Sequence, residues 1–210
     1  MKIVKKFEQQ STVAEFYDKI LKHVLYKIGD LWSENKLDVA TEHVCSNIAN
    51  EVIHKINKNN PKNAKKSSIL ICTPEGEIHN IGCNIIESIL LQRGYKVYNI
   101  SPSMPSESVI KYINDTKPSM ILISVTLKDN IGSAKRLAKK IKAQCGKSIL
   151  LGGLALRYIS EKEKTDIETN PSVKIIIDAS LEKIHQAIRE ITRKTTAVTE
   201  INNPSKFSKP

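Results

Sequence analysis

A histidine and a glutamate two residues apart are the side chains of this 210-residue sequence best suited to chemistry. They are Glu77 and His79 in the stretch EGEIHNIG, and Gly82 follows three residues later. An imidazole that binds a metal ion is commonly held by a carboxylate on its second ring nitrogen, which fixes the tautomer and raises the basicity of the ligand. The spacing therefore predicts that His79 is a metal ligand supported by Glu77.

The kind of metal follows from how few protein ligands accompany this histidine. The four cysteines include no C-x-x-C pair, which argues against a zinc site and against a disulfide framework. One histidine would leave most of an ordinary metal's coordination sphere empty, whereas a metal already held in a macrocycle needs only an axial ligand. Gly82 removes a side chain where a large ring would lie close to the backbone.

The elements that must position these residues alternate between strands and helices. Apolar runs predict strands at 67–72, 95–100, 119–125, 147–153 and 173–179, and helical patterns occupy 84–94, 105–117, 130–146 and 180–194. Fully apolar strands separated by helices indicate a parallel sheet covered on both faces. We expect an α/β fold, a flavodoxin-like (Rossmann-like) five-stranded parallel sheet with strand order 2-1-3-4-5.

Three strands of this order deliver polar or small residues to one edge of the sheet. The first ends in CTPEGEIHNIG, the third in SVTLKDN and the fourth in LGGLALR. Glu77 and His79 would therefore lie near Ser124, Thr126 and the pair Gly152–Gly153. The third strand ends in a serine rather than an aspartate, which argues against a phosphoacceptor receiver, and no G-x-G-x-x-G dinucleotide fingerprint is present.

Two amphipathic helices are predicted ahead of the sheet, from about Val13 to Trp32 and from Leu37 to Ile56. We expect a helical cap over residues 1–58, a basic linker over 59–67, the α/β domain over 68–195 and a disordered tail over 196–210. Two amphipathic helices leave apolar surface exposed. A homodimer or another protein partner is therefore expected to cover the cap.

The net charge of +11 is large, and its basic residues are concentrated at 54–66 and 134–147. Such patches could attract nucleic acid, although no helix-turn-helix or zinc-finger motif accompanies them and aromatic residues are few. No apolar run approaches the ~20 residues that span a bilayer. The N-terminus lacks the apolar stretch of a secretory signal. We expect a cytoplasmic protein without a membrane segment.

The edge residues together resemble a known family. The series E-x-H-x-x-G (Glu77, His79, Gly82), S-x-T (Ser124, Thr126) and G-G (Gly152, Gly153) resembles the cobalamin-binding domain, whose usual form begins D-x-H-x-x-G. The resemblance implies that His79 replaces the dimethylbenzimidazole base as the lower axial ligand of cobalt. It also implies that Glu77 hydrogen-bonds to His79, and that Ser124 and Gly153 line the channel for the detached nucleotide tail.

The cap carries a second resemblance. Trp32, followed nine residues later by Glu42 and His43, is similar to the helical cap over the upper corrin face in adenosylcobalamin-dependent light-sensing regulators, and more loosely to the cap of corrinoid methyl carriers. The resemblance implies that Trp32 packs over the upper ligand, with Glu42 and His43 near the adenosyl group. Ser33 stands where the regulators have the histidine that can bind cobalt after photolysis.

Three functions remain open at this point. The favoured prediction is a cobalamin-binding regulatory or sensory module that holds adenosylcobalamin in the base-off, His-on form, in which a histidine replaces the cofactor's own base on cobalt. Such a module would resemble the photoreceptors that act in transcription regulation, and it would have no catalytic residues of its own. The alternative is a corrinoid protein that carries methyl groups, as methylcobalamin, for a methyltransferase system. A further rival is the small subunit of a carbon-skeleton mutase. The form of cofactor that the protein retains would distinguish them.

Overall fold

The computed structural model describes residues 12–58, 66–169 and 172–201. Its centre is a five-stranded sheet in the order β2-β1-β3-β4-β5 with every pairing parallel, which confirms the predicted order. The strands are β1 Ser68–Cys72, β2 Lys96–Asn99, β3 Met120–Ser124, β4 Ser148–Gly152 and β5 Val173–Ile175. The register pairs Cys72 with Ile123 and Ser124 with Gly152, so the central strands end level at one edge.

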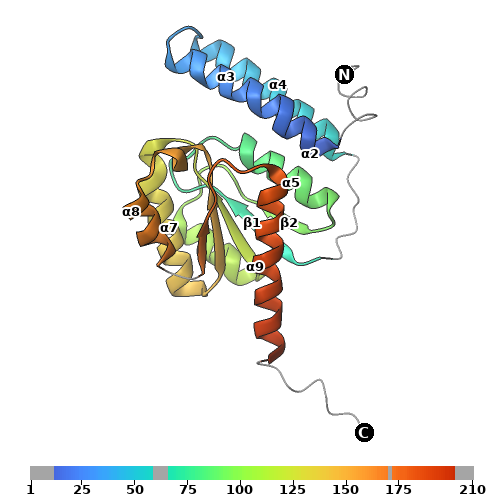
Figure 1. Cartoon of the computed structure of the whole chain (residues 1–210), viewed down its shortest axis with the longest axis vertical. Helices are drawn as coiled ribbons and strands as arrows, with labels where there is room; N and C mark the ends of the chain where they lie inside the picture. Colours follow the sequence, from blue (N-terminus) through green and yellow to red (C-terminus); the bar gives the residue numbers. More distant parts are fainter. Residues whose placement is uncertain (1–11, 59–65, 170–171, 202–210) are drawn as a thin grey trace.

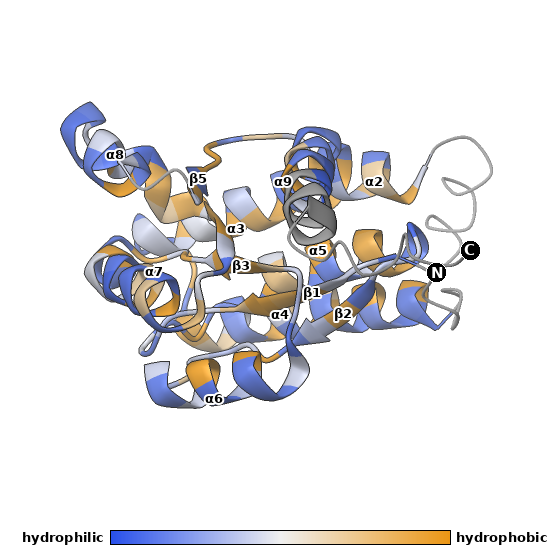
Figure 2. Cartoon of the chain, turned by 90° about the horizontal axis from the view of Figure 1, so that it is seen from below, coloured by the Kyte–Doolittle hydropathy of each residue, from blue (hydrophilic) through white to orange (hydrophobic). Residues whose placement is uncertain are grey.

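Helices cover both faces of the sheet (Figure 2). They are α5 Ile81–Gln92, α6 Ser106–Thr116, α7 Ile131–Cys145, α8 Glu161–Glu168 and α9 Leu181–Ile201. Alternate residues of each strand enter opposite cores: Leu70 packs with residues of α6 and α7, whereas Ile69 and Ile71 pack with α5 and α9. Burial on both faces explains why the strands are apolar at every position rather than at every second one.

The structure corrects two expectations about the second half of the chain. Helix α8 was not predicted, and it begins with a capping box in which Ser160 and Glu163 bond each other's backbone N–H. Helix α9 continues to Ile201, so residues 196–201 are helical within the segment expected to be a disordered tail. No glycine or proline interrupts the chain between Leu181 and Pro204, so nothing local ends the helix earlier. Residues 202–210 lie outside the described part of the chain.

A long helical hairpin lies above the carboxyl edge of the sheet (Figure 1). Its first arm runs without a break through α2 Val13–Phe16, the π-helical stretch η1 Tyr17–Leu21 and α3 Lys22–Ser33, and its second arm is α4 Val39–Asn57. Thr12 and Glu15 cap the first arm as a capping box. The linker expected at 59–67 falls mostly on residues 59–65, which lie outside the described residues.

The hairpin is anchored to the α/β domain on both sides of the edge. On the α5 side, Asn84 donates to the Asn50 side chain of α4 at 2.9 Å, and the Tyr17 and Ser88 hydroxyls are 3.0 Å apart. On the β4–β5 side, Arg157 of η3 (Leu154–Tyr158) lies over the Tyr26 ring of α3, 4.8 Å from its centroid. The hairpin therefore spans the region where the strand ends converge.

Much of the hairpin's apolar surface is uncovered, as the sequence predicts. No residue of α3 is buried, and the exposed large apolar side chains of the cap are Val24, Trp32, Val39, Val44 and Ile48. The basic patch at 134–147 is partly neutralised, because Lys135 and Lys140 form ion pairs with Glu163 and Glu107. Of the helices that the structure describes, none combines the length and apolar character needed to span a membrane.

Burial of His185 predicts a loss of stability in mild acid. Both ring nitrogens of this α9 residue are buried without a hydrogen-bond partner, and its ring meets Tyr95 edge-on at 5.9 Å. Burial lowers the pKa of His185 most, and the charge of Arg93 lowers it further. Glu182, whose Oε1 is 3.7 Å from His185 Nδ1, acts to raise this pKa but does not outweigh burial. Below pH ~6.5 the unfolded chain therefore binds a proton that the folded chain resists, and stability falls until the lower folded pKa is passed.

Urea unfolding between pH 7 and pH 5 measures this effect. We expect the midpoint to fall with pH in the wild type and to fall less in His185→Phe. His23→Phe, which changes an exposed histidine of α3, serves as the control and should keep the wild-type dependence. Equal slopes in wild type and His185→Phe would contradict the prediction.

Candidate functional site

Glu77 connects the loops that form the candidate site at the carboxyl edge of the sheet. It lies in the loop from β1 to α5 and its side chain is fully buried. Its Oε1 accepts from the His79 backbone N–H at 3.0 Å and lies 2.7 Å from His79 Nδ1. Its Oε2 accepts from the backbone N–H groups of Thr126 and Leu127, each at 2.9 Å, and from Asn130 Nδ2 at 3.1 Å. One carboxylate thus ties the β1–α5 loop to the β3–α7 loop.

These contacts keep Glu77 ionised. Burial alone would raise the pKa of its carboxyl, but the hydrogen bonds from His79, Leu127 and Asn130 outweigh burial and lower the pKa to about 2. The hydrogen bond to Glu77 in turn raises the pKa of His79, against burial, which lowers it. A buried ionised carboxylate with several N–H donors is a rigid acceptor. It therefore holds the His79 ring in one orientation.

One ring nitrogen of His79 is held by Glu77 and the other is left without a hydrogen bond in the part of the chain that the structure describes. Its Nδ1 is taken by Glu77, Nε2 makes no hydrogen bond within the described residues, and the side chain is 42% exposed. The charge of Glu42 on α4 acts on His79, so the ring lies within electrostatic reach of the hairpin above it. This is the orientation that carboxylate support gives to a metal-binding imidazole.

Ser124 and Gly82 also meet at this edge. A Cβ on Gly82 would lie 3.8 Å from Ser124 Oγ, which is ordinary contact, so the protein's own packing does not require a glycine at position 82. Burial raises the pKa of the Cys83 thiol, in the first turn of α5, to about 11, and the nearby Ser101 and Ser124 side chains act to lower it. Thr126 belongs to the site through its backbone N–H, which binds Glu77, rather than through its hydroxyl.

The double glycine packs directly against the end of β3. Gly153 has φ +120°, and a Cβ there would lie 2.1 Å from the carbonyl oxygen of Val125. Gly152 accepts a hydrogen bond from the Val125 N–H at 2.9 Å and has no positive φ. From the sequence, these glycines were expected beside a channel for the nucleotide tail. The structure shows that position 153 requires a glycine in any case, because its backbone touches the backbone of Val125.

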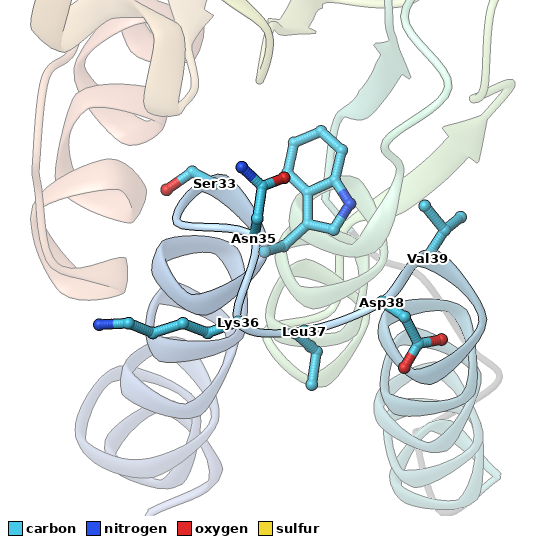
Figure 3. Close-up of a pocket in the computed structure, with 7 residues that line it drawn as sticks. Ser33, Asn35, Lys36, Leu37, Asp38 and Val39 are labelled. Carbon is cyan, nitrogen blue, oxygen red and sulfur yellow. The ribbon is translucent and has the colours of Figure 1, made fainter.

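The cap residues divide into two places. Glu42 and His43 lie together on α4, where His43 Nδ1 is 2.6 Å from Glu42 Oε2 and Ser46 Oγ donates to Glu42 Oε1 at 2.6 Å. Trp32 lies in the last turn of α3 and is 47% exposed. With Ser33 and residues 35–39 it lines a pocket of about 580 Å³ at the turn between α3 and α4 (Figure 3). The Ser33 hydroxyl donates to the Asp30 carbonyl oxygen at 2.8 Å.

Two polar residues of the site were missed from sequence. Asn130 precedes α7 and donates to both Glu77 and the Gly76 carbonyl, at 3.1 and 3.4 Å. Thr73 donates to the Glu77 carbonyl at 3.1 Å and accepts from the Ser103 N–H at 2.7 Å. Both were visible as polar residues just after apolar strands, but neither spacing alone showed which carboxylate they would contact.

Glu77→Gln is expected to lower the stability of the folded protein. An amide cannot accept from two sets of N–H donors at both ends, so at least one buried donor loses its partner. We expect a loss of about 2–3 kcal/mol in the free energy of unfolding, measured in urea. Glu75→Gln, in the same loop but exposed, should leave stability unchanged. A Glu77→Gln variant as stable as Glu75→Gln would contradict this account of the carboxylate.

Comparison with known proteins identifies the class to which this fold and site belong. Models of the B12 binding domain match residues 67–169, which contain strands β1 to β4 and the Glu77–His79 loop, and residues 2–56, which contain nearly all of the hairpin. The chain belongs to the B12-binding-domain proteins and is a cobalamin-binding protein. This confirms the resemblance drawn from the sequence.

Relatives narrow the comparison. The chain is 22% identical to dimethylamine corrinoid protein 3 of Methanosarcina acetivorans over 158 residues, 73% of this chain and 74% of the relative. It is 29% identical over 100 residues to methionine synthase of Mycobacterium tuberculosis, but that match covers 43% of this chain and only 8% of the enzyme. The monomethylamine corrinoid protein of Methanosarcina barkeri shares the fold, with a TM-score of 0.71, 15% identity, and coverage of 90% and 89% of the two chains.

Proposed function

We propose that this protein is a corrinoid carrier, which holds cobalamin with His79 as the lower axial ligand of cobalt and carries a methyl group for a methyltransferase system. The observation that carries the proposal is the His79 ring, whose Nδ1 is held by buried, ionised Glu77 while Nε2 stays free below the hairpin. The extent of the match to a dimethylamine corrinoid protein, about three quarters of both chains, favours a carrier over the sensory module.

The residues present fit the cofactor. An imidazole nitrogen open on one side and held by a carboxylate on the other is a suitable axial donor. Gly82 is free of any packing demand for a glycine, as expected of a position that keeps room for a ring. Cobalamin would supply a cobalt ion that accepts and releases a methyl group. Ser124 and Gly153 are proposed to line the path of the nucleotide tail.

A sensory module that holds adenosylcobalamin is the second candidate. The Glu42–His43 pair favours it, because two polar side chains held together on α4 could meet the ribose of an adenosyl group. Against it, the Ser33 hydroxyl is engaged with the Asp30 carbonyl and cannot act as a nitrogen ligand. Trp32 lies at the end of the hairpin and shares its pocket with the turn rather than with Glu42 or His43.

A carrier also requires a protein partner, because the methyl group must be received and given up on separate proteins. The exposed apolar side chains Val24, Val44 and Ile48 of the hairpin are proposed to meet such a partner or a second copy of this chain. Light scattering on the purified protein distinguishes a homodimer from a monomer that awaits a different partner. Nucleic acid at the basic patches stays a prediction that no contact in the structure addresses.

Competition between two cofactor forms tests the carrier proposal. The protein is incubated in the dark with equal amounts of methylcobalamin and adenosylcobalamin, desalted, and the bound forms are quantified after release. A carrier should retain methylcobalamin at least as well as adenosylcobalamin, and His79→Ala should retain little of either. Retention of adenosylcobalamin alone, with a change of oligomeric state on illumination with green light, would instead establish the sensory module.

A further inference from the structure

Two histidines of this chain are supported in the same way, and only one of them belongs to the lower-face motif. His79 is backed by Glu77 with a Nδ1–Oε1 distance of 2.7 Å, and His43 is backed by Glu42 with a Nδ1–Oε2 distance of 2.6 Å. The second oxygen of Glu42 is occupied as well, since it accepts from Ser46. In both pairs the carboxylate fixes Nδ1, so the nitrogen available to a ligand is Nε2.

The packing of α4 on α5 places His43 near the loop that holds His79. Asn50 of α4 bonds to Asn84 of α5, and His54 of α4 lines a groove with Glu87 of α5, so the two helices lie side by side in the same direction (Figure 1). His43 is seven residues before Asn50, on the same side of α4 and about 10.5 Å toward its N-terminus. Helix α5 begins at Ile81, so this displacement carries His43 past its start, toward the loop that holds His79.

His43 is well suited to bind a metal ion held between α4 and the loop that contains His79. Its side chain is 67% exposed, whereas its supporting Glu42 is only 22% exposed. A surface ion pair between neighbouring residues of a helix would have no need of a partly buried carboxylate bonded at both oxygens. A carboxylate held in this way keeps the imidazole oriented, as it does at His79.

We propose that His43 is a second axial ligand, which binds the cobalt of the oxidised cofactor through Nε2 on the face opposite His79, with Glu42 as its positioning residue. The proposal rests on the carrier function proposed above. Binding exchanges one water molecule for a neutral imidazole, and no electron or proton is transferred. Any group carried on the upper face takes the same position, so His43 withdraws when the cofactor is loaded. The paired histidines thus close both faces of the unloaded form.

Absorption spectra of the protein loaded with hydroxocobalamin test this assignment. The variants are His43→Gln and, as the matched control on the same helix, His54→Gln, which changes another exposed histidine. Wild type and His54→Gln should give the same spectrum, and added imidazole should leave both unchanged. His43→Gln should shift the visible bands to shorter wavelength, as water replaces a nitrogen ligand, and imidazole should restore the wild-type spectrum.

The outcomes separate this inference from the carrier proposal. If wild type retains the cofactor in a His79-dependent form while His43→Gln has the wild-type spectrum, the assignment of His43 is overturned and the carrier proposal stands. If wild type retains no cofactor, both are overturned. Glu42→Gln adds a readout that a merely structural pair would not give: it should permit partial displacement by added azide or cyanide at concentrations about 10–100-fold below those needed for wild type.

Discussion

His79→Ala is expected to abolish base-off, His-on binding of cobalamin. The variant removes the imidazole that Glu77 holds in the loop from β1 to α5, and that loop, residues 73–80, contains no second histidine to take its place. Loss of a supporting residue typically costs 10–100-fold in metal affinity, so loss of the ligand itself should cost at least about 100-fold. Cofactor retention after desalting, followed by absorbance, measures the effect.

The control separates ligation from general damage to the fold. His23→Ala removes an exposed histidine of α3 and should retain cofactor like the wild type. His79→Ala itself should unfold at nearly the wild-type urea concentration, because the His79 side chain is partly exposed and Glu77 keeps its backbone donors. Full retention of a His-on spectrum by His79→Ala would contradict the site described here.

Gly153→Ala should give the largest loss of stability of any single methyl group added at the edge. The residue has φ +120°, where side chains are rarely accommodated, and its Cβ would lie 2.1 Å from the Val125 carbonyl oxygen and 2.6 Å from the Val125 nitrogen. Strained dihedral angles and a backbone clash together should cost at least about 3 kcal/mol. For a protein of this size that corresponds to a fall in Tm of roughly 6–12 °C.

Gly152→Ala is the matched control for this prediction. Its Cβ would meet the Ile176 side chain at 3.3 Å, a contact that a small side-chain shift can relieve, and its φ is not positive. We expect a loss of about 1 kcal/mol or less. Thermal unfolding of both variants tests the pair, and equal melting temperatures would show that the approach of Val125 does not explain the second glycine.

The sheet could be predicted from sequence because its strands are apolar without interruption and are separated by helical periodicity. Helix α8 escaped this reasoning, since its eight residues are mostly charged and it buries none of them. The end of α9 was placed too early because Thr195 and Thr196 resemble a polar tail, although they contain no helix-breaking residue. A helix that buries few side chains has little apolar periodicity in its sequence, so it is hard to predict from sequence alone.

The site residues likewise differ in how far they could be predicted from the sequence. Glu77 and His79 were predictable, because the chemistry depends on two residues that are close in sequence. Asn130 was not, since it reaches Glu77 from 53 residues away and only the folded sheet edge brings it there. The pairing of Glu42 with His43 was visible as a neighbouring pair, but the position of this pair relative to the His79 loop depends on how α4 packs on α5.

The most direct test of the account is the identity of the nitrogen below the cobalt. The protein is labelled with ¹⁵N at histidine, loaded with unlabelled cobalamin, reduced by one electron, and examined by electron paramagnetic resonance. If His79 is the lower ligand, each cobalt line should split into two by the spin of ¹⁵N, whereas unlabelled protein gives three. Three lines from the labelled protein would mean that the cofactor's own base still binds the metal, and the central claim would be wrong.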